Sequence, residues 1–373
     1  MSTRWIQQYA RRHALSQRAV EELEEIVDGF SQASVEDEIT VQVGATSAGV
    51  SQGEDPFHNP VKRFEVLGVL GKGGMGEVLR VREIPLNRVL AMKVIRQDRE
   101  TTSKEEIEFS REVQITAQLQ HPGIVSVHQA GRLEDGRPFY TMNEVRGRVL
   151  TRVIEEVHQA SQRGPWRPAV SGWTFRRLID AYLKACEAVA YAHDHGVVHR
   201  DLKPANVMLG DFGEVIVVDW GLAKVMDENE AARVSTTMDM DQTVAGTVIG
   251  TVSYMPPEQA RGEVGRLGPL ADVYSLGAIL YHILSGRKPY AGQSPLQVLA
   301  RVQSGELPPP TRQALEDEWE DEGTFMFSGN ESLGISSQPS LPDDLVTICM
   351  RAMAPEPEGR CTAREVAVAV ATW

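Results

Sequence analysis

The pattern of apolar and polar positions divides the chain into segments with different periods. In residues 3–30, apolar side chains recur at three- and four-residue steps, which predicts one amphipathic helix. The stripe in its second half consists of Val20, Leu23, Val27 and Phe30. We interpret this stripe as a surface packed on the following domain, with a partner-docking helix as the alternative. From Ser31 to about Pro60, Ser, Gly, Gln and acids follow without a clear period, which indicates a flexible linker.

At Phe64 the period changes to two. Residues 64–95 alternate β-branched and apolar side chains around turn formers, which is the pattern of an antiparallel sheet. Further strands are predicted at Ile124–Ala130 and Pro138–Val145, on either side of a turn that ends at Gly136. Residues 103–120 have helical spacing. This part of the chain is therefore expected to form a sheet with one helix.

Helical periods dominate the rest of the chain. A long buried helix is predicted from Phe175 to His195. Glycine and prolines break the period in segment 158–173, which we interpret as an inserted loop. A second insertion, 313–340, holds a nearly contiguous run of acids; a solvated loop is the preferred interpretation and a docking segment the alternative. The most apolar stretch, 276–284, is half the length that spans a membrane.

Composition narrows the class of protein. The chain has 373 residues, enough for two lobes with separate cores, and a formal net charge of -14. This charge argues against general binding to nucleic acid or anionic membranes. Cys186, Cys349 and Cys361 form no CxxC pair and lie in apolar segments, so we expect buried thiols in a reducing compartment. The N-terminal stretch lacks the apolar core of a signal peptide, and we expect a cytoplasmic chain without a membrane span.

Glycines interrupt the predicted sheet at one place. Gly71, Gly73 and Gly76, followed by Val78, give the pattern G-x-G-x-x-G, in which backbone N–H groups can approach phosphates. The pattern alone also fits dinucleotide-binding turns and plain hairpins. Strand character continues on both sides of the glycines with no helical period, so a glycine-rich hairpin over a nucleotide fits better than a dinucleotide fold.

A lysine lies inside an apolar strand nearby. The run Ala91 to Val94 contains Lys93, whose charge is costly in such a strand unless an anion pairs with it. The helix at 103–120 offers several carboxylates: Glu105, Glu106, Glu108 and Glu112. From the spacing alone, any of them could be surface charge.

The stretch 199–207, HRDLKPANV, carries the strongest candidate chemistry. It places the carboxylate of Asp201 near the ammonium of Lys203 and the amide of Asn206, with Pro204 stiffening the backbone. Such a loop can offer a base for a hydroxyl proton, a cation for a phosphate and a ligand for a metal ion. These groups suit phosphoryl transfer.

Two Asp-containing turns compete for a second metal ligand. They are Asp211-Phe212-Gly213 and Asp219-Trp220-Gly221. A hairpin is predicted from a strand at 207–209, a turn at 210–214 and a returning strand at 215–218. This hairpin returns Asp219 beside Asn206 and leaves Asp211 at the tip of the turn, where Asp and Gly are common for backbone reasons. We therefore assign the metal ligand to Asp219.

Together these motifs resemble a family. GKGGMGEV, AMKV, HRDLKPAN, DWGLAK, GTVSYMPPEQ and DVYSLG occur in the order found in eukaryotic-type serine/threonine protein kinases, and residues 61–373 look most like those of bacteria. Lys203 is typical of the serine/threonine form of the loop. The resemblance implies an α+β, bilobal protein kinase fold. Its small antiparallel β-sheet lobe with a helix would span about 61–145 and its larger, mostly helical lobe about 146–373, after an extension at 1–60.

The resemblance also implies a nucleotide site for ATP. Its glycine loop would comprise Gly71, Lys72, Gly73, Gly74, Met75 and Gly76. Val78, Ala91 and Met208 would enclose the adenine. Met142 resembles the gatekeeper, and the backbone of Glu144 to Val145 the hinge that meets adenine. Lys93 would hold the phosphates, fixed by Glu112, which resembles the pairing acid because it follows a Phe by three positions.

The family mechanism is positioning plus charge neutralisation, and its template supplies the roles. In this resemblance Asp201 orients the substrate hydroxyl and accepts its proton, and Lys203 neutralises the transferring phosphoryl group. Asn206 and Asp219 bind Mg²⁺, with Mn²⁺ as a substitute. Two departures from the family leave these groups in place: Trp220 replaces a Phe expected to pack inward, and Pro256 replaces an Ala.

Regulation and structural anchors follow from the same resemblance. Arg200 would pair with a phosphate on the segment 219–258, and we expect autophosphorylation of Thr243 or Thr247, through a transient homodimer. Thr251 would contact Asp201 and Lys203. Two pairings are expected to be structural: Asp272 would anchor the catalytic loop, and Arg360 would pair with Glu258.

Three functions remain open at this point. The first is an active serine/threonine protein kinase acting on proteins, and the second is a nucleotide-binding pseudokinase scaffold. The third is a small-molecule phosphotransferase of the same fold. Intact Lys93, Asp201, Asn206 and Asp219 oppose the scaffold, and the long segment before Glu258 opposes the small-molecule enzyme, which has no peptide to seat.

Overall fold

The computed structural model describes most of the chain after residue 62. The described residues are 63–72, 76–95, 103–161, 164–220, 224–225, 252–292, 294–312 and 341–373. They all fall in one compact unit, 55–373. The predicted helix at 3–30, the linker and the insertion at 313–340 lie outside the described residues.

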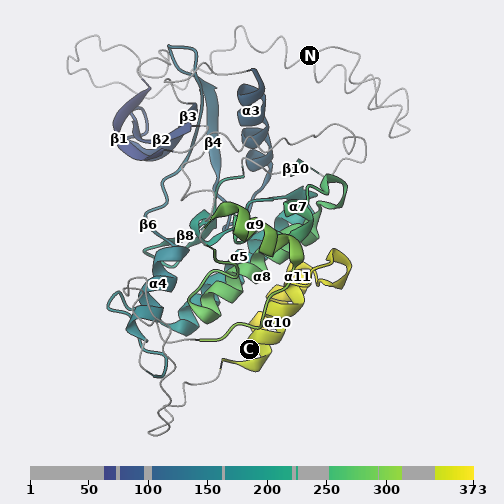
Figure 1. Ribbon diagram of the computed structural model, residues 1–373. Coiled ribbons are helices and arrows are strands. Elements are labelled where there is room, and N and C mark those ends of the chain that lie inside the picture. Colours follow the sequence, from purple (N-terminus) through teal and green to yellow (C-terminus); the bar gives the residue numbers. More distant parts are fainter. Residues whose placement is uncertain are drawn as a thin grey trace, which may run out of the picture. The chain divides into compact units, whose positions relative to one another are not determined.

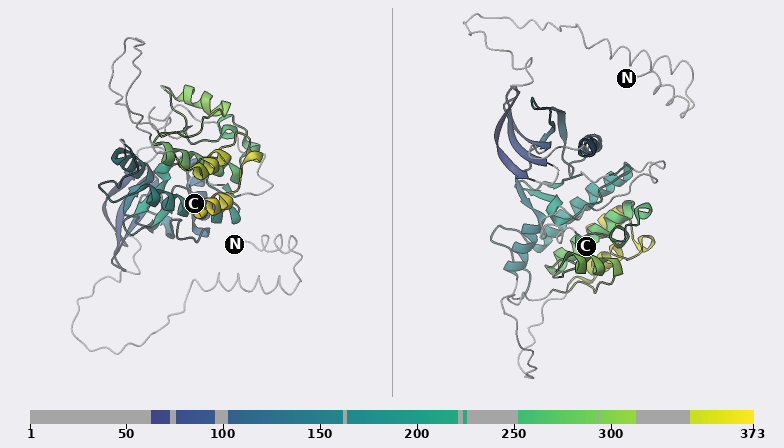
Figure 2. Two further views of the ribbon diagram at one scale, coloured as in Figure 1. Left: turned by 90° about the horizontal axis from the view of Figure 1, so that it is seen from below. Right: turned by 45° about the horizontal axis from the view of Figure 1, so that its top comes forward.

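The first strands form a five-stranded antiparallel sheet (Figure 1). Its strands are β1 (Phe64–Lys72), β2 (Gly76–Glu83), β3 (Arg88–Ile95), β4 (Val127–Arg132) and β5 (Pro138–Asn143). They lie in the order β1-β2-β3-β5-β4. Helix α3 (Ser103–Gln118) packs beside this sheet (Figures 1 and 2). The predicted sheet with one helix is confirmed.

Alternation along the strands separates two faces of the sheet. Leu79, Val81, Leu90, Met92 and Val94 are all buried and form a small core with Phe139 on one face. The intervening positions 78, 91 and 93 point to the opposite face, because successive side chains alternate in a strand. Those positions line a cavity.

One predicted strand begins too early. Ile124 does not belong to β4; it forms a single parallel bridge to Val217 and is 2% exposed. Ile124 ends the tight turn that follows α3, in which its N–H donates to the His121 carbonyl (3.0 Å), and β4 begins only at Val127. Its apolar character therefore reflects burial against the helical part of the chain. The following strand also ends earlier than predicted, at Asn143.

Helices are the main regular elements of the remaining described residues. They are α4 (Leu150–Ala160), α5 (Phe175–Asp194), α7 (Pro257–Ala260), α8 (Pro269–Ser285), α9 (Pro295–Ser304), α10 (Asp343–Ala352) and α11 (Ala363–Thr372). A Thr362–Glu365 capping box starts α11 by satisfying its first N–H groups. The sheet followed by these helices confirms the predicted α+β class.

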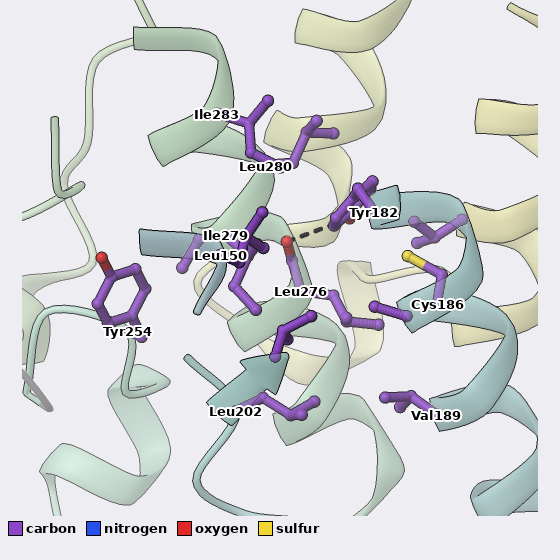
Figure 3. Close-up of a cluster of buried hydrophobic side chains, with 14 of the residues drawn as sticks. Leu150, Tyr182, Cys186, Val189, Leu202, Tyr254, Leu276, Ile279, Leu280 and Ile283 are labelled. Atoms are coloured by element: carbon purple, nitrogen blue, oxygen red, sulfur yellow. Dashed lines mark hydrogen bonds between the residues drawn. The ribbon is translucent and has the colours of Figure 1, made fainter. Parts of the chain in front are cut away.

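Helix α8 runs through the core of the helical lobe. Every residue from Ala271 to Ser285 is buried. Its Leu276, Ile279 and Leu280 pack against α5, and the Tyr182 hydroxyl of α5 donates to the Leu276 carbonyl oxygen at 3.1 Å (Figure 3). The apolar run at 276–284 thus lies at the centre of the core of the helical lobe. Across the described ranges, none of the helices combines the length and the apolar character needed to cross a bilayer.

The segment predicted as an inserted loop is partly helical and packed. Helix α4 continues through His158 to Ala160. In the following loop, the Trp166 ring stacks on Phe175 with centroids 4.1 Å apart and planes at 11°. The Ala169 N–H donates to the Trp173 carbonyl at 2.8 Å. Aromatic stacking therefore holds this loop against the start of α5.

Short strands complete the fold around the candidate site. Strands β6 (Gly147–Val149), β8 (Val207–Gly210) and β9 (Val215–Val217) form one sheet, and β7 (Val197–Val198) pairs with β10 (Lys224–Val225). The β8–β9 pair is the predicted hairpin, with its turn between residues 210 and 215. Gly147 has no room for a side chain, which would collide with the Leu209 carbonyl.

Candidate active site

The loop that carries Asp201 is anchored by hydrogen bonds to Asp272 of α8. The Asp272 carboxylate accepts hydrogen bonds from the His199 N–H (2.7 Å), the Arg200 N–H (2.8 Å) and His193 Nε2 (2.9 Å). Burial opposes its charge, but these donors outweigh the burial and lower the pKa of Asp272. The expected anchoring role is confirmed by these contacts. Arg200 has a φ of 69°, a left-handed conformation that is costly for a side chain of this size.

Three predicted side chains meet within the loop. The Lys203 Nζ donates to Asp201 Oδ2 at 2.7 Å, and Asn206 Nδ2 donates to the Asp201 carbonyl at 2.8 Å. A short 3-10 helix, Pro204–Asn206, turns the amide back toward Asp201. The carboxylate is therefore held in one orientation before any substrate arrives.

The hairpin returns Asp219 to this loop as expected. The Val218 N–H donates to the Asn206 carbonyl at 2.9 Å, and Asp219 follows with a φ of 67°. Asp211 lies at the exposed turn instead, and its neighbour Phe212 is 95% exposed. Strained backbone at a non-glycine residue often marks a functional position, and Asp219 has it.

Trp220 packs inward, as expected for the residue after this Asp. It is 1% exposed, its indole N–H donates to the Val217 carbonyl at 3.2 Å, and its ring lies 4.6 Å from that of His199. It shares a buried cluster with Ile115 of α3. The larger side chain is accommodated without displacing Asp219 from the site.

Glu112 is the carboxylate that pairs with Lys93. The Lys93 Nζ lies 2.5 Å from Glu112 Oε1 and 3.5 Å from Asp219 Oδ1. Glu112 is buried, whereas Glu106 of the same helix pairs with Arg132 at the surface. Burial opposes the lysine charge, but the two carboxylates outweigh it and raise the pKa of Lys93.

These groups line one cavity of about 830 Å³. The predicted residues that reach it are Gly71, Lys72, Gly76, Val78, Ala91, Lys93, Glu112, Met142, Val145, Asp201, Asn206, Met208 and Asp219. Lys203 does not line the cavity, and it contacts the site through its bond to Asp201. Gly73, Gly74, Met75, Thr243, Thr247 and Thr251 lie outside the described residues.

The hinge differs in one side chain from the expectation. Glu144 does not line the cavity; its carboxylate pairs with Arg80 (2.8 Å) and Arg146 (3.1 Å). The neighbouring Asn143 does line it, and its Oδ1 lies 2.7 Å from His128 Nε2. The hinge backbone contact to adenine stays a prediction.

Several lining residues were not predicted. They are Leu70, Thr116, Val125, Tyr140, Asn143, Gly147, Ala205, Val218 and Trp220. Tyr140 matters most, because its hydroxyl donates to Glu112 Oε1 at 2.8 Å. The signal that could have found it is the pairing of β3 with β5, which sets Tyr140 opposite Lys93. Strands that are not consecutive in the chain give no such register from sequence alone.

The donor set suits a nucleotide with a divalent cation. Val78, Ala91 and Met208 offer apolar surface for a planar base, and Lys93 offers a cation for phosphates. Asn206 and Asp219 offer the oxygen ligands that hard divalent cations prefer. The residues present therefore fit both groups.

Comparison with known proteins points to one family. A family model described as protein kinase domain matches residues 64–369. The chain is 38% identical over 256 residues to serine/threonine-protein kinase PknB of Mycolicibacterium smegmatis, across 68% of this chain and 37% of the relative. It is 36% identical over 254 residues to PknB of Mycobacterium tuberculosis, across 67% and 37%.

A third relative, serine/threonine-protein kinase PknD of Protochlamydia amoebophila, is 36% identical over 250 residues, across 65% of this chain and 25% of the relative. The chain therefore matches well under half of the length of these relatives. The fold, the order of the motifs and the family match agree, and the chain belongs to the protein kinase domain family, with similarity to the serine/threonine-protein kinases of bacteria.

Proposed function

We propose that this chain transfers the γ-phosphoryl group of Mg-ATP to serine and threonine hydroxyls of proteins. The observation that carries the proposal is the convergence of Lys93, Asp201, Asn206 and Asp219 on one cavity. The relatives, all named serine/threonine-protein kinases, support the same activity. Nothing in the comparisons supports the pseudokinase alternative.

The nucleotide would lie between the sheet and the helical lobe. Val78 and Ala91 would cover one side of the adenine and Met208 the other, while the hinge after Met142 would bind its edge through the backbone. The glycine hairpin around Gly71 would cover the phosphates. Lys93, whose ammonium has donors left beyond Glu112, would bind the phosphate oxygens.

The catalytic loop would act on the acceptor. Asp201 would orient the serine or threonine hydroxyl and accept its proton. Its carboxylate accepts hydrogen bonds from Lys203 Nζ at 2.7 Å and from Asn206 Nδ2 at 3.3 Å, which orient it, and Asn206 also binds the Asp201 carbonyl at 2.8 Å. Lys203 would also neutralise charge on the transferring group.

Protein kinases use ATP and a divalent cation in general. In this chain we propose Mg²⁺, with Mn²⁺ as a substitute, held by Asn206 and Asp219. When bound, Mg-ATP supplies the phosphoryl group and neutralises its charge. Because ATP is its substrate, we propose a cytoplasmic location for the domain.

We propose that phosphorylation of its own segment switches the enzyme on. Arg200 supports this: its Nε is buried, and no partner within the described residues reaches it. Burial lowers the pKa of Arg200, and the nearby Asp272 charge offsets this only in part, which leaves room for a further counter-ion. A phosphate on Thr243 or Thr247, added by a second copy in a transient homodimer, would supply one. Mass spectrometry of active enzyme should find one of these threonines modified.

The activity is tested by one transfer assay. Purified chain is incubated with radiolabelled ATP, Mg²⁺ and casein, and label in casein and in the chain is measured for the wild type and for Asp201→Asn. We expect label on serine and threonine with the wild type and a loss of more than about 10²-fold with the variant. A folded wild type that binds ATP but transfers no label under any of these conditions would instead favour the scaffold alternative.

A further inference from the structure

The buried hydroxyl of Tyr140 has no role in the mechanism described above, yet it reaches the centre of the site. It donates to Glu112 Oε1 at 2.8 Å, the same oxygen that accepts the Lys93 ammonium at 2.5 Å. Tyr140 and Glu112 are each 3% exposed. Two donors from the sheet thus converge on one carboxylate of α3.

The sheet register explains this convergence. Lys93 of β3 and Tyr140 of β5 are directly opposite in an antiparallel pair, so their side chains project from the same face. The Tyr140 ring also packs on Phe109 of α3, with centroids 5.5 Å apart. Phe109 precedes Glu112 by three positions and lies on the same helix face. Tyr140 therefore holds α3 by its ring and by its hydroxyl.

The Tyr140 hydroxyl and the Lys93 ammonium differ in the partners available to them. Lys93 also faces Asp219 at 3.5 Å and the cavity, so it can exchange partners. Tyr140 is neutral and buried, and its hydroxyl donates to Glu112 Oε1. Burial raises the pKa of Tyr140 well above its ordinary value, and the Glu112 carboxylate raises it further, so the hydroxyl keeps its proton and stays a donor.

We propose that Tyr140 is a positioning residue for phosphoryl transfer: its hydroxyl keeps the Glu112 carboxylate in place, so that Lys93 returns to one position at the phosphates. The proposal rests on the proposed kinase activity. A hydrogen bond to a carboxylate in a buried site is stronger than one between neutral groups. Its loss should therefore be visible in the rate without loss of the fold.

The test compares two matched deletions of a buried hydroxyl. Tyr140→Phe keeps the ring on Phe109 and removes only the oxygen. Tyr182→Phe is the control, because the Tyr182 hydroxyl is equally buried but donates to the Leu276 carbonyl in the helical core (Figure 3). We expect Tyr140→Phe to lower kcat/KM for casein phosphorylation about tenfold, and Tyr182→Phe to change it less than about twofold.

Two readouts separate positioning from a merely structural role. In the Glu112→Met background, Tyr140→Phe should cost less than about twofold, because the acceptor on which the hydroxyl acts is gone. In hydrogen exchange of the full chain, Tyr140→Phe should speed exchange of the α3 amides, and Tyr182→Phe should not.

The outcomes are distinguishable. An active wild type whose kcat/KM is unchanged by Tyr140→Phe overturns this inference alone. A tenfold loss that persists in the Glu112→Met background also overturns it, because the hydroxyl would then act elsewhere. An inactive wild type overturns the proposed kinase activity first, and the inference with it.

Discussion

Two buried ion pairs, one in each lobe, are built in different ways. In the helical lobe, Arg360 and Glu258 have side chains 0% and 1% exposed and join through two parallel bonds of 2.7 and 2.8 Å. The remaining Arg360 donors bind the carbonyls of Ala354, Leu270 and Pro355. In the small lobe, Lys93 is 15% exposed and faces Glu112, Asp219 and the cavity.

This difference suggests that the Arg360–Glu258 pair stabilises the fold, whereas the Lys93–Glu112 pair serves phosphoryl transfer. The planar guanidinium of Arg360 has its donors saturated and so admits a single arrangement. The ammonium of Lys93 is a compact charge with donors to spare. The first pair should therefore matter for folding and the second for transfer.

The largest expected effect is on folding. Arg360→Leu leaves the Glu258 carboxylate buried without its partner, which should cost about 3–5 kcal/mol of unfolding free energy. Urea denaturation of wild type and variant measures it. Arg266→Leu is the matched control, because Arg266 makes exposed pairs with Glu263, Glu356 and Glu358 and should cost less than about 1 kcal/mol. Equal losses for the two variants would contradict the comparison.

The next effect is on transfer. Lys93→Met should lower phosphorylation of casein by at least about 10²-fold, because it removes the donor that we propose binds the reacting phosphates. Its melting temperature should fall less than that of Arg360→Leu, because Glu112 keeps the Tyr140 hydroxyl as a donor and lies beside the cavity. Lys184→Met is the control, since Lys184 lies outside the cavity and binds the Gly213 carbonyl at 2.9 Å. A Lys93→Met variant that keeps most of its activity would contradict the proposed role of Lys93 at the phosphates.

The pH dependence of stability should sharpen the comparison in the helical lobe. Burial lowers the pKa of His282 to about 3, and His158 and Lys288 add to the shift. The folded chain keeps this His neutral, so unfolding takes up a proton below about pH 6.5 and stability falls as the pH drops. The slope from His282 is up to about 1.4 kcal/mol per pH unit. Urea denaturation at pH 7 and pH 5 should show a flatter dependence for His282→Gln; an unchanged slope would contradict this.

The stability of the small lobe should depend on pH at the alkaline end of the pH scale, through Lys93. Because the folded pKa of Lys93 is raised above its ordinary value of 10.5, its pairing contributes stability that is full below that pH. The contribution is lost only as the pH rises through the folded pKa. Acid therefore weakens the helical lobe through His282, while the Lys93 ammonium stays charged.

Local patterns made part of the site predictable. The β8–β9 hairpin and the return of Asp219 depend on about fifteen neighbouring residues, so strand propensity and turn chemistry were sufficient. The pair Lys93–Glu112 was reached through the family resemblance rather than from charge alone. The family also supplied the Asp272 anchor, because nothing local in α8 indicates which backbone it binds.

Features that depend on distant packing were missed. Tyr140 opposite Lys93 follows from the pairing of β3 with β5, which are separated by α3 and β4. Ile124 has strand-like chemistry, but its burial comes from a bridge to Val217. The loop after α4 contains helix breakers, and only the stack of Trp166 on Phe175 makes it part of the packed body. In each case tertiary contacts override a local pattern.

The central claim is that the cavity joining Lys93, Asp201 and Asp219 is the site of transfer and that Asp219, not Asp211, serves it. The most direct test sets Asp219→Asn beside Asp211→Asn, the same change eight residues apart, in one assay of Mg²⁺-dependent casein phosphorylation. We expect Asp219→Asn to lose more than about 10²-fold, because it removes the proposed metal ligand and its charge, and Asp211→Asn to stay within about twofold. A folded Asp211→Asn variant that is inactive, beside an active Asp219→Asn, would contradict the account.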